Sequence, residues 1–95
     1  MTTEDLAVTH NEAARRFEVI LGDAVAFLRY GRDGSHMTMQ HTEVPKEFEG
    51  KGIASRIAQT AMDFARDNGL KVIPHCPYVA GWITRHPEYE SITVR

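Results

Sequence analysis

The sequence holds a single cysteine, Cys76, among its 95 residues. An internal disulfide is therefore impossible, and a lone thiol is typical of proteins from reducing compartments. No apolar run approaches the length of a membrane helix, and Met1–His10 lacks the apolar core of a signal peptide. From these absences we expect a cytoplasmic protein that makes no membrane contact.

An excess of charge of one sign is also missing. The chain has 11 Lys and Arg against 13 Asp and Glu, which gives a net charge of −2 with neutral histidines. Nucleic-acid-binding domains usually carry a basic excess, so we expect no nucleic-acid partner. The histidines form no His-x-x-x-His pair and Cys76 has no Cys-x-x-Cys partner, so the sequence predicts no metal site.

The length and composition of the chain fit one small globular domain spanning residues 1–95. Apolar residues make up 42% of the sequence and charged residues 25%, which is ordinary for such domains. A chain this short buries only about two thirds of its unfolded surface, so a homodimer would add stability.

The first half of the chain predicts an antiparallel meander of three strands. Met1–Ala14 is polar, and we expect it to be loosely ordered. Arg15–Leu21 alternates apolar and polar residues, Gly22-Asp23 is a hairpin turn, and Ala24–Tyr30 returns. Ser35–Val44 is the third strand, and a period of two places Met37, Met39, His41 and Glu43 on one of its faces.

The second half predicts a helix, a strand and a short helix. Apolar residues at Ile53, Ile57, Ala61 and Phe64 give a helical stripe, and Asn68-Gly69 ends it. Leu70–His75 is then a strand parallel to the third one, because a helical crossover connects the two. Tyr78–Arg85 predicts a short second helix, and Ser91–Val94 a possible last edge strand. The fold class is therefore α+β with one mixed sheet.

The segment just before the long helix has the features of an anion site. Glu49-Gly50-Lys51-Gly52-Ile53-Ala54-Ser55 places two glycines where the helical periodicity begins. Glycines let a backbone approach a ligand closely, and a helix start offers free amides and a positive dipole end. An ordinary glycine loop before a helix is about as common, so the spacing alone leaves both interpretations open.

Neighbouring segments strengthen the ligand interpretation, because together they resemble very short members of the GNAT superfamily of N-acetyltransferases. The superfamily's pyrophosphate loop, Gln/Arg-x-x-Gly-x-Gly/Ala, corresponds to Glu49-x-x-Gly52-x-Ala54, with Glu49 as the departure. The resemblance extends to His41–Pro45, Gly69–Tyr78 and Arg85–Tyr89. It implies a minimal GNAT-like fold and acetyl-CoA (coenzyme A) as the cofactor.

The resemblance also implies where the cofactor lies. The strands Met37–Val44 and Leu70–His75 splay apart, and the pantetheine arm fills the gap between them. Glu49 points away from the phosphates or is offset by Lys51. The expected cofactor-binding residues are Val44, Glu49, Gly50, Lys51, Gly52, Ile53, Ala54, Ser55, Tyr78 and Arg85.

Three residues are candidates for the chemistry near the thioester. His41 or Glu43 would act as the base that removes the amine proton, although each would equally suit a polar strand end. Cys76 is either a nucleophile that takes the acetyl group or a small buried hydrophobe. His41 is the expected partner of a reactive Cys76, because His75 points to the opposite face.

The resulting hypothesis is an acetyl-CoA-dependent N-acetyltransferase for a small amine or an accessible peptide or protein amine. The two-residue turn Gly22-Asp23 leaves no room for the helices that larger GNAT enzymes carry there. The acceptor site would be open, or completed by a second copy or a partner protein. The alternatives are a non-catalytic acyl-CoA-binding or regulatory module, which Glu49 favours, and a partner-binding domain without a cofactor.

Overall fold

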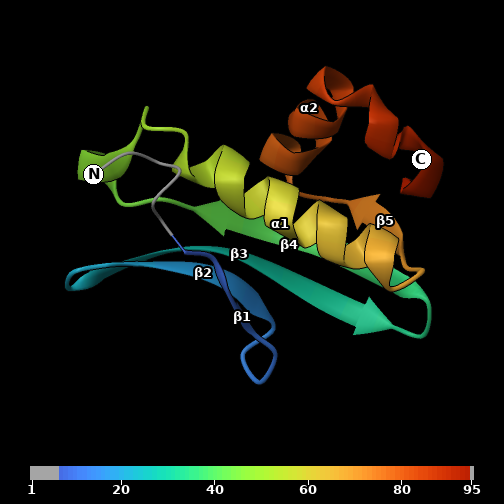
Figure 1. Ribbon diagram of the computed structural model, residues 1–95, viewed down its shortest axis with the longest axis horizontal. Coiled ribbons are helices and arrows are strands. Elements are labelled where there is room, and N and C mark those ends of the chain that lie inside the picture. Colours follow the sequence, from blue (N-terminus) through green and yellow to red (C-terminus); the bar gives the residue numbers. More distant parts are fainter. Residues whose placement is uncertain (1–6, 95) are drawn as a thin grey trace.

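A five-stranded mixed sheet is the frame of the protein (Figure 1), in a computed structural model that describes residues 7–94. The strands lie side by side in chain order: β1 (Thr9–Asn11), β2 (Arg16–Leu21), β3 (Ala24–Asp33), β4 (His36–Glu43) and β5 (Lys71–Pro74). The pairs from β1 to β4 are antiparallel, and β5 is parallel to β4. The predicted α+β fold, with a meander followed by a parallel crossover, is confirmed.

Two α-helices pack against this sheet. α1 (Ile53–Asp67) lies along it, and α2 (Pro77–Arg85) lies beside α1 at the β5 end (Figure 1). Short 3₁₀ helices precede α1, as η2 (Lys46–Phe48), and follow α2, as η3 (Pro87–Ile92). Among residues 7–94, no helix is both long and apolar enough to cross a membrane.

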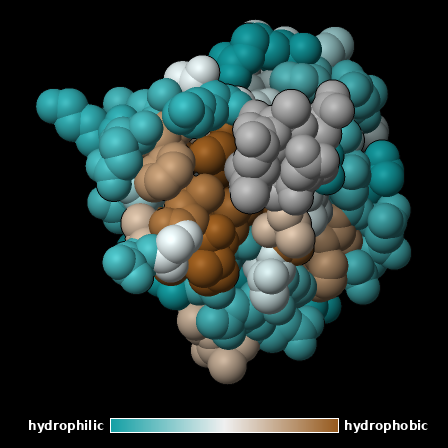
Figure 2. All heavy atoms as spheres, turned by 60° about the vertical axis from the view of Figure 1, so that its left-hand side comes forward, coloured by the Kyte–Doolittle hydropathy of each residue, from teal (hydrophilic) through white to brown (hydrophobic). Residues whose placement is uncertain are grey.

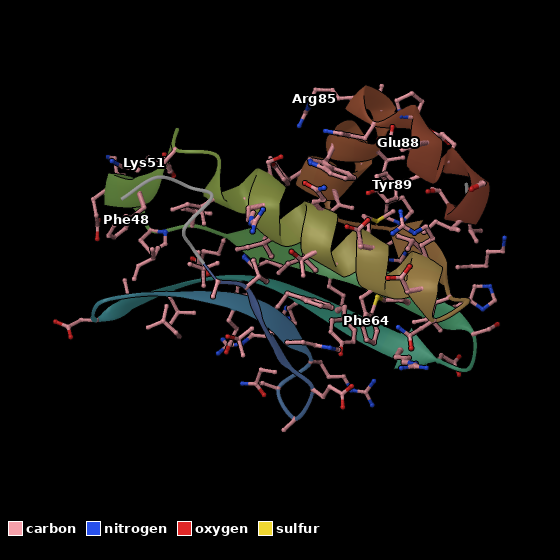
Figure 3. The ribbon with its side chains drawn as sticks, in the orientation of Figure 1. Phe48, Lys51, Phe64, Arg85, Glu88 and Tyr89 are labelled. Carbon is pink, nitrogen blue, oxygen red and sulfur yellow. The ribbon has the colours of Figure 1, made fainter. Side chains whose placement is uncertain are left out.

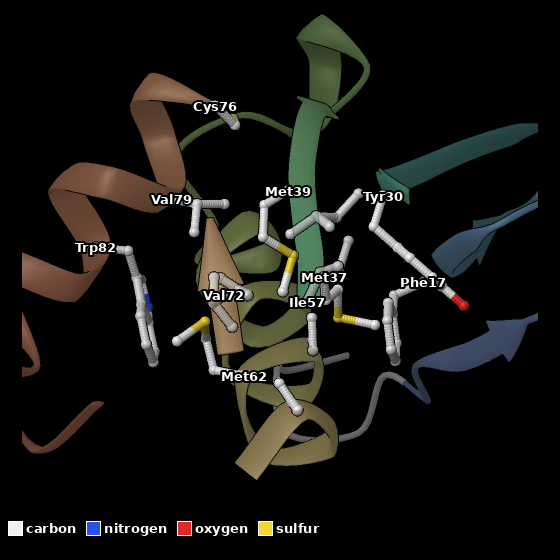
Figure 4. Close-up of a cluster of buried hydrophobic side chains, with 14 of the residues drawn as sticks. Phe17, Tyr30, Met37, Met39, Ile57, Met62, Val72, Cys76, Val79 and Trp82 are labelled. Atoms are coloured by element: carbon white, nitrogen blue, oxygen red, sulfur yellow. The ribbon is translucent and has the colours of Figure 1, made fainter. Parts of the chain in front are cut away.

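The core lies between the sheet and the two α-helices (Figure 4). The buried face of α1 has the spacing that the sequence predicts. Phe64, the last residue of the predicted apolar stripe, is only partly buried. The largest side chains with almost no exposure come from the sheet and from both α-helices. They are Phe17, Val19, Leu28, Met37, Met39 and Val72 of the sheet, Ile57 and Met62 of α1, and Val79, Trp82 and Ile83 of α2.

The N-terminal segment is more ordered than its polar composition predicts. Thr9–Asn11 pairs with β2, and the His10 ring stacks on Phe17 with 4.1 Å between ring centroids. His10 Nε2 also lies 2.5 Å from the hydroxyl oxygen of Tyr30. The expectation of a loose Met1–Ala14 is thus wrong for this strand, because partners from β2 and β3 order it; residues 1–6 lie outside the described part.

The C-terminal segment also differs from the prediction. A 3₁₀ helix continues to Ile92, and only Thr93 forms a parallel bridge, with Val72. The Tyr89 hydroxyl donates a hydrogen bond to Asp63 of α1 at 2.5 Å, which holds η3 against that helix. Burial first, and then this hydrogen bond, raise the pKa of Tyr89 to about 12, so the hydroxyl stays a neutral donor.

A hydrogen bond ties α2 to the first turn of α1. Trp82 is 1% exposed, and its Nε1 donates to Ser55 Oγ at 2.9 Å. The indole ring also stacks on His86, with 3.9 Å between the centroids. The start of α1 is therefore positioned by the second helix as well as by the sheet.

Replacing this acceptor should destabilise the fold. Ser55→Ala leaves the buried indole N–H without a partner, so we expect the free energy of unfolding to fall by about 1–3 kcal/mol. Urea denaturation measures the loss. Thr84→Ala, which removes an exposed hydroxyl from α2, is the matched control and should change it little. An equal effect of both substitutions would contradict the assigned role of Ser55.

Stability should also depend on the protonation of His10. Burial lowers the pKa of His10 below its ordinary value of 6.5; the Arg32 charge lowers it further, and Glu12 opposes both. The unfolded chain then binds a proton at a higher pH than the folded chain. The stabilisation is complete above pH 6.5 and is lost as the pH falls from there through the lowered pKa.

We therefore expect the free energy of unfolding, measured by urea denaturation, to decrease as the pH falls below about 6.5. His10→Gln should flatten this decrease, because glutamine does not titrate. His36→Gln replaces an exposed histidine at the start of β4 and should leave it unchanged. A decrease of the same size in the His10→Gln variant would show that another group is responsible.

Candidate functional site

The loop before α1 presents free backbone amides. Gly50 and Gly52 both have φ of 79°, a left-handed conformation that favours glycine, and Gly52 is the N-cap residue of α1. The first intrahelical hydrogen bond runs from Arg56 N to Gly52 O at 3.1 Å. The amides of Ile53, Ala54 and Ser55 come before that bond, so they have no intrahelical acceptor and lie at the positive end of the helix dipole.

These amides border a pocket of about 270 Å³. The side chains of Val44, Phe48 and Ile53 give it an apolar wall, and Figure 2 shows a band of apolar side chains at this end of the molecule. The lining residues are Val44, Phe48, Glu49, Gly50, Gly52, Ile53, Ala54, Ser55 and Tyr78. The structure thus brings together in one pocket all the predicted cofactor-binding residues except Lys51 and Arg85.

The two exceptions lie next to lining residues. Lys51 is exposed between the two glycines, and Arg85 projects from α2 (Figure 3). The Arg85 guanidinium lies 6.0 Å from the ring centroid of Tyr78, a lining residue of the pocket. Glu49 is itself a lining residue, which leaves Lys51 as the cation in the same loop. Sequence reasoning missed Phe48, an aromatic residue directly before the glycine pattern.

β4 and β5 pair over only half of β4. Their register runs from His36 with Lys71 to Met39 with Pro74, and Cys76 N then donates to Met39 O at 2.9 Å. Beyond this point Gln40–Glu43 has a strand neighbour only in β3, within the part of the chain that the structure describes. Proline has no N–H to donate, and the chain leaves the sheet to begin α2. The free edge of β4 leads to Val44, which lines the pocket.

A β-bulge changes which side chains of β4 face the gap between the strands. Tyr30 pairs with Met39 and Arg29 with His41, so Gln40 is an extra residue without a partner in β3. After the bulge it is Thr42 that faces inward, with its Oγ1 3.4 Å from Cys76 Sγ. The predicted common face of Met37, Met39, His41 and Glu43 is therefore wrong, because period-two counting contains no inserted residue.

The three candidate catalytic residues fall into two places. His41 and Glu43 lie together on the outer face of β4, with 53% and 62% of their side chains exposed and 3.8 Å between Nε2 and Oε2. Cys76 is 4% exposed and lies at the fork, the point after Met39 and Pro74 where β4 and β5 cease to pair. The expected partnership of His41 with Cys76 is wrong, since Thr42 is the residue beside the thiol. No signal in the sequence singled out Thr42.

Metal-ligating side chains do not cluster in the described part of the chain. Among residues 7–94, no three His, Cys, Asp or Glu groups come close enough together to hold an ion. What the pocket does offer is backbone amides for an anion and an apolar wall, both beside an unpaired strand edge.

Comparison with known proteins bears on this arrangement. Protein NATD1 from Xenopus tropicalis is 35% identical over 88 residues, which cover 90% of this chain and 81% of that protein. Protein NATD1 from Homo sapiens is 34% identical over 85 residues, covering 86% and 75%. The solution structure of a GCN5-like protein from Staphylococcus aureus superposes with a TM-score of 0.75 at 22% identity, over 95% of this chain and 89% of that one.

The structural match, at its low identity, supports the fold alone. A family model described as GCN5-related N-acetyl-transferase matches residues 16–92, which include the pocket lining and the diverging strands β4 and β5. The chain belongs to the GCN5-related N-acetyl-transferase family.

Proposed function

We propose that this protein is an acetyl-CoA-dependent N-acetyltransferase that acts on a small amine or an accessible peptide or protein amine. The observation that carries the proposal is the continuity between the pocket at the start of α1 and the free edge of β4. One part suits a diphosphate and the other suits an extended chain with amide groups. Membership of the family supports the same reaction class.

The residues of the pocket fit the cofactor. A Cβ added to Gly50 would meet no atom within 4 Å, so the loop leaves open space there. The amides of Ile53, Ala54 and Ser55 would hold the diphosphate, as helix N-termini do. The unpaired backbone groups of Gln40–Glu43 would bind the amides of the pantetheine arm, in the way an added strand pairs with a sheet edge.

Acetyl-CoA, when bound, supplies an acetyl group as a thioester. In the direct route, an amine would attack the thioester carbonyl, the carbon–sulfur bond would break with coenzyme A leaving as a thiolate, and the amine would give up a proton. His41 or Glu43 would take that proton, since both are exposed enough to meet an acceptor.

In the second route, the acetyl group passes through the protein. The Cys76 sulfur would attack the thioester carbon, and its proton would pass to the sulfur of coenzyme A as that carbon–sulfur bond breaks. An amine would then attack the acetyl-cysteine, the new carbon–sulfur bond would break, and the amine proton would return to the Cys76 sulfur. The place of Cys76 at the fork supports this route, and the Thr42 hydroxyl beside Sγ would orient the thiol. The exposed His41 and Glu43 would take no part in the first step.

A non-catalytic acyl-CoA-binding module is the second candidate. It is favoured by Glu49, a carboxylate in the lining of a pocket for phosphates, and by the direct pairing of Leu21 with Ala24 across the Gly22-Asp23 turn. That turn leaves one face of the sheet without a covering helix. The chain alone would then have no wall against which to hold an acceptor.

The pocket at the start of α1 can be tested with variants of two glycines that both have positive φ. Gly50 and Gly34 both have positive φ, and a Cβ on either meets nothing within 4 Å. Leucine at either position should cost roughly 1–2 kcal/mol of stability. Only Gly50→Leu should reduce the rise in melting temperature that acetyl-CoA produces by linkage. No rise in the wild-type protein at millimolar acetyl-CoA would remove both candidate functions.

The route of the acetyl group can be read by mass spectrometry. After incubation with acetyl-CoA, the Cys76 route predicts a gain of one acetyl group that Cys76→Ala abolishes together with turnover. The direct route predicts no gain, and His41→Gln or Glu43→Gln would lower turnover by roughly 10²-fold. His36→Gln, at the other end of β4, is the control. Binding without turnover on a panel of amines and peptides would favour the non-catalytic module.

A further inference from the structure

A second hollow, of about 390 Å³, lies at the opposite end of β3 from the acetyl-CoA pocket. Its lining residues are Glu12, Ala13, Arg15, Tyr30 and Arg32, and none of them lines the first pocket. The candidate acetyl-transfer residues do not reach it either. The hollow therefore needs an explanation of its own.

The chain builds this hollow rigidly. Arg15 has φ of 57°, an uncommon conformation for a residue with a side chain, and both of its backbone groups are tied. Its N–H donates to Glu12 O at 3.1 Å, and its carbonyl accepts from Tyr30 N at 2.9 Å. Arg32 is two residues beyond Tyr30 on β3, so both point to the same face of the sheet.

The charges in the hollow are unbalanced. Arg15 and Arg32 form no ion pair with any residue among 7–94, whereas Arg16 pairs with Glu18 and Arg66 with Asp63. The one carboxylate present, Glu12, lies 4.0 Å from His10 Nδ1. The hollow is thus lined by two arginines and one glutamate, together with the buried Tyr30.

We propose that this hollow binds a small oxyanion, a carboxylate or a phosphate, through the guanidiniums of Arg15 and Arg32. A guanidinium presents a planar fork of donors that matches two oxygens of either group. The site is separate from the acetyl-CoA pocket, and its occupation does not depend on the proposed acetyl transfer.

The pKa of His10 should change when an anion binds in this hollow. The groups that bear on its ring are the Tyr30 hydroxyl, the Glu12 carboxylate and the Arg32 guanidinium; the other contacts are the rings of Phe17 and Phe64. Burial first, and then the Arg32 charge, hold the pKa of His10 below 6.5. An anion bound to Arg32 offsets that charge, so binding should raise the pKa of His10.

The experiment is an NMR titration of the whole chain with inorganic phosphate and, separately, with succinate, at constant ionic strength. We expect saturable shifts of the amides around Arg15 and Arg32 and an upward shift of the His10 titration. The probe that binds more tightly identifies the oxyanion. Arg15→Gln with Arg32→Gln should weaken binding about tenfold or more. Arg29→Gln, on the opposite face of β3, should not.

Gly50→Leu separates the two sites, because phosphate can also bind the amides at the start of α1. Shifts around Arg32 that persist in this variant support the second site. Shifts confined to the residues around Gly50, or equal affinity in the Arg15→Gln/Arg32→Gln variant and the wild type, would overturn the proposal. So would the absence of any saturable shift at the hollow with both probes. If the double variant does not fold, the exposed single substitution Arg32→Gln decides.

Discussion

The hydrogen-bond ladder between β4 and β5 stops at Met39 and Pro74, and the candidate site depends on that stop. Backbone donors and acceptors must find partners, so an edge that opens in the middle of a sheet is met by water or by a ligand. The proline ends the pairing, and Cys76 supplies the last link before the chain turns into α2. The unpaired half of β4 then leads without interruption into the pocket at the start of α1.

The helix whose first turn borders this pocket, α1, also contributes to the core. Ile57 and Met62 of α1 are completely buried against the sheet, a few residues after the amides that border the pocket. The hydrogen bond from Trp82 to Ser55 fixes the first turn from the other side. In a chain of this size the site and the core are thus parts of one cooperative unit, and a ligand at the helix start would stabilise the whole fold.

The bulge at Gln40 decides how the chemistry can be arranged. It places Thr42 against Cys76 inside the fork and leaves His41 and Glu43 on the outer face. A proton acceptor on the outer face and a nucleophile inside the fork belong to different routes for the acetyl group. The same strand therefore carries the residues of both routes, on its two faces.

The sequence by itself determined the order of the strands and α-helices from β2 to α2, the bounds of α1 to within a residue and most of the pocket lining. These depend on local chemistry: apolar periodicity, glycines at positive φ, and prolines that end pairing. Only the tertiary structure decided that His10 orders β1, that Tyr89 holds η3 against α1, and that Thr42 faces Cys76. Each of these depends on a partner 20 or more residues away in the chain, and the last depends also on one residue inserted between paired strands. Neither leaves a periodic signal in the sequence, because each is fixed by contacts that form only when the strands and helices pack together.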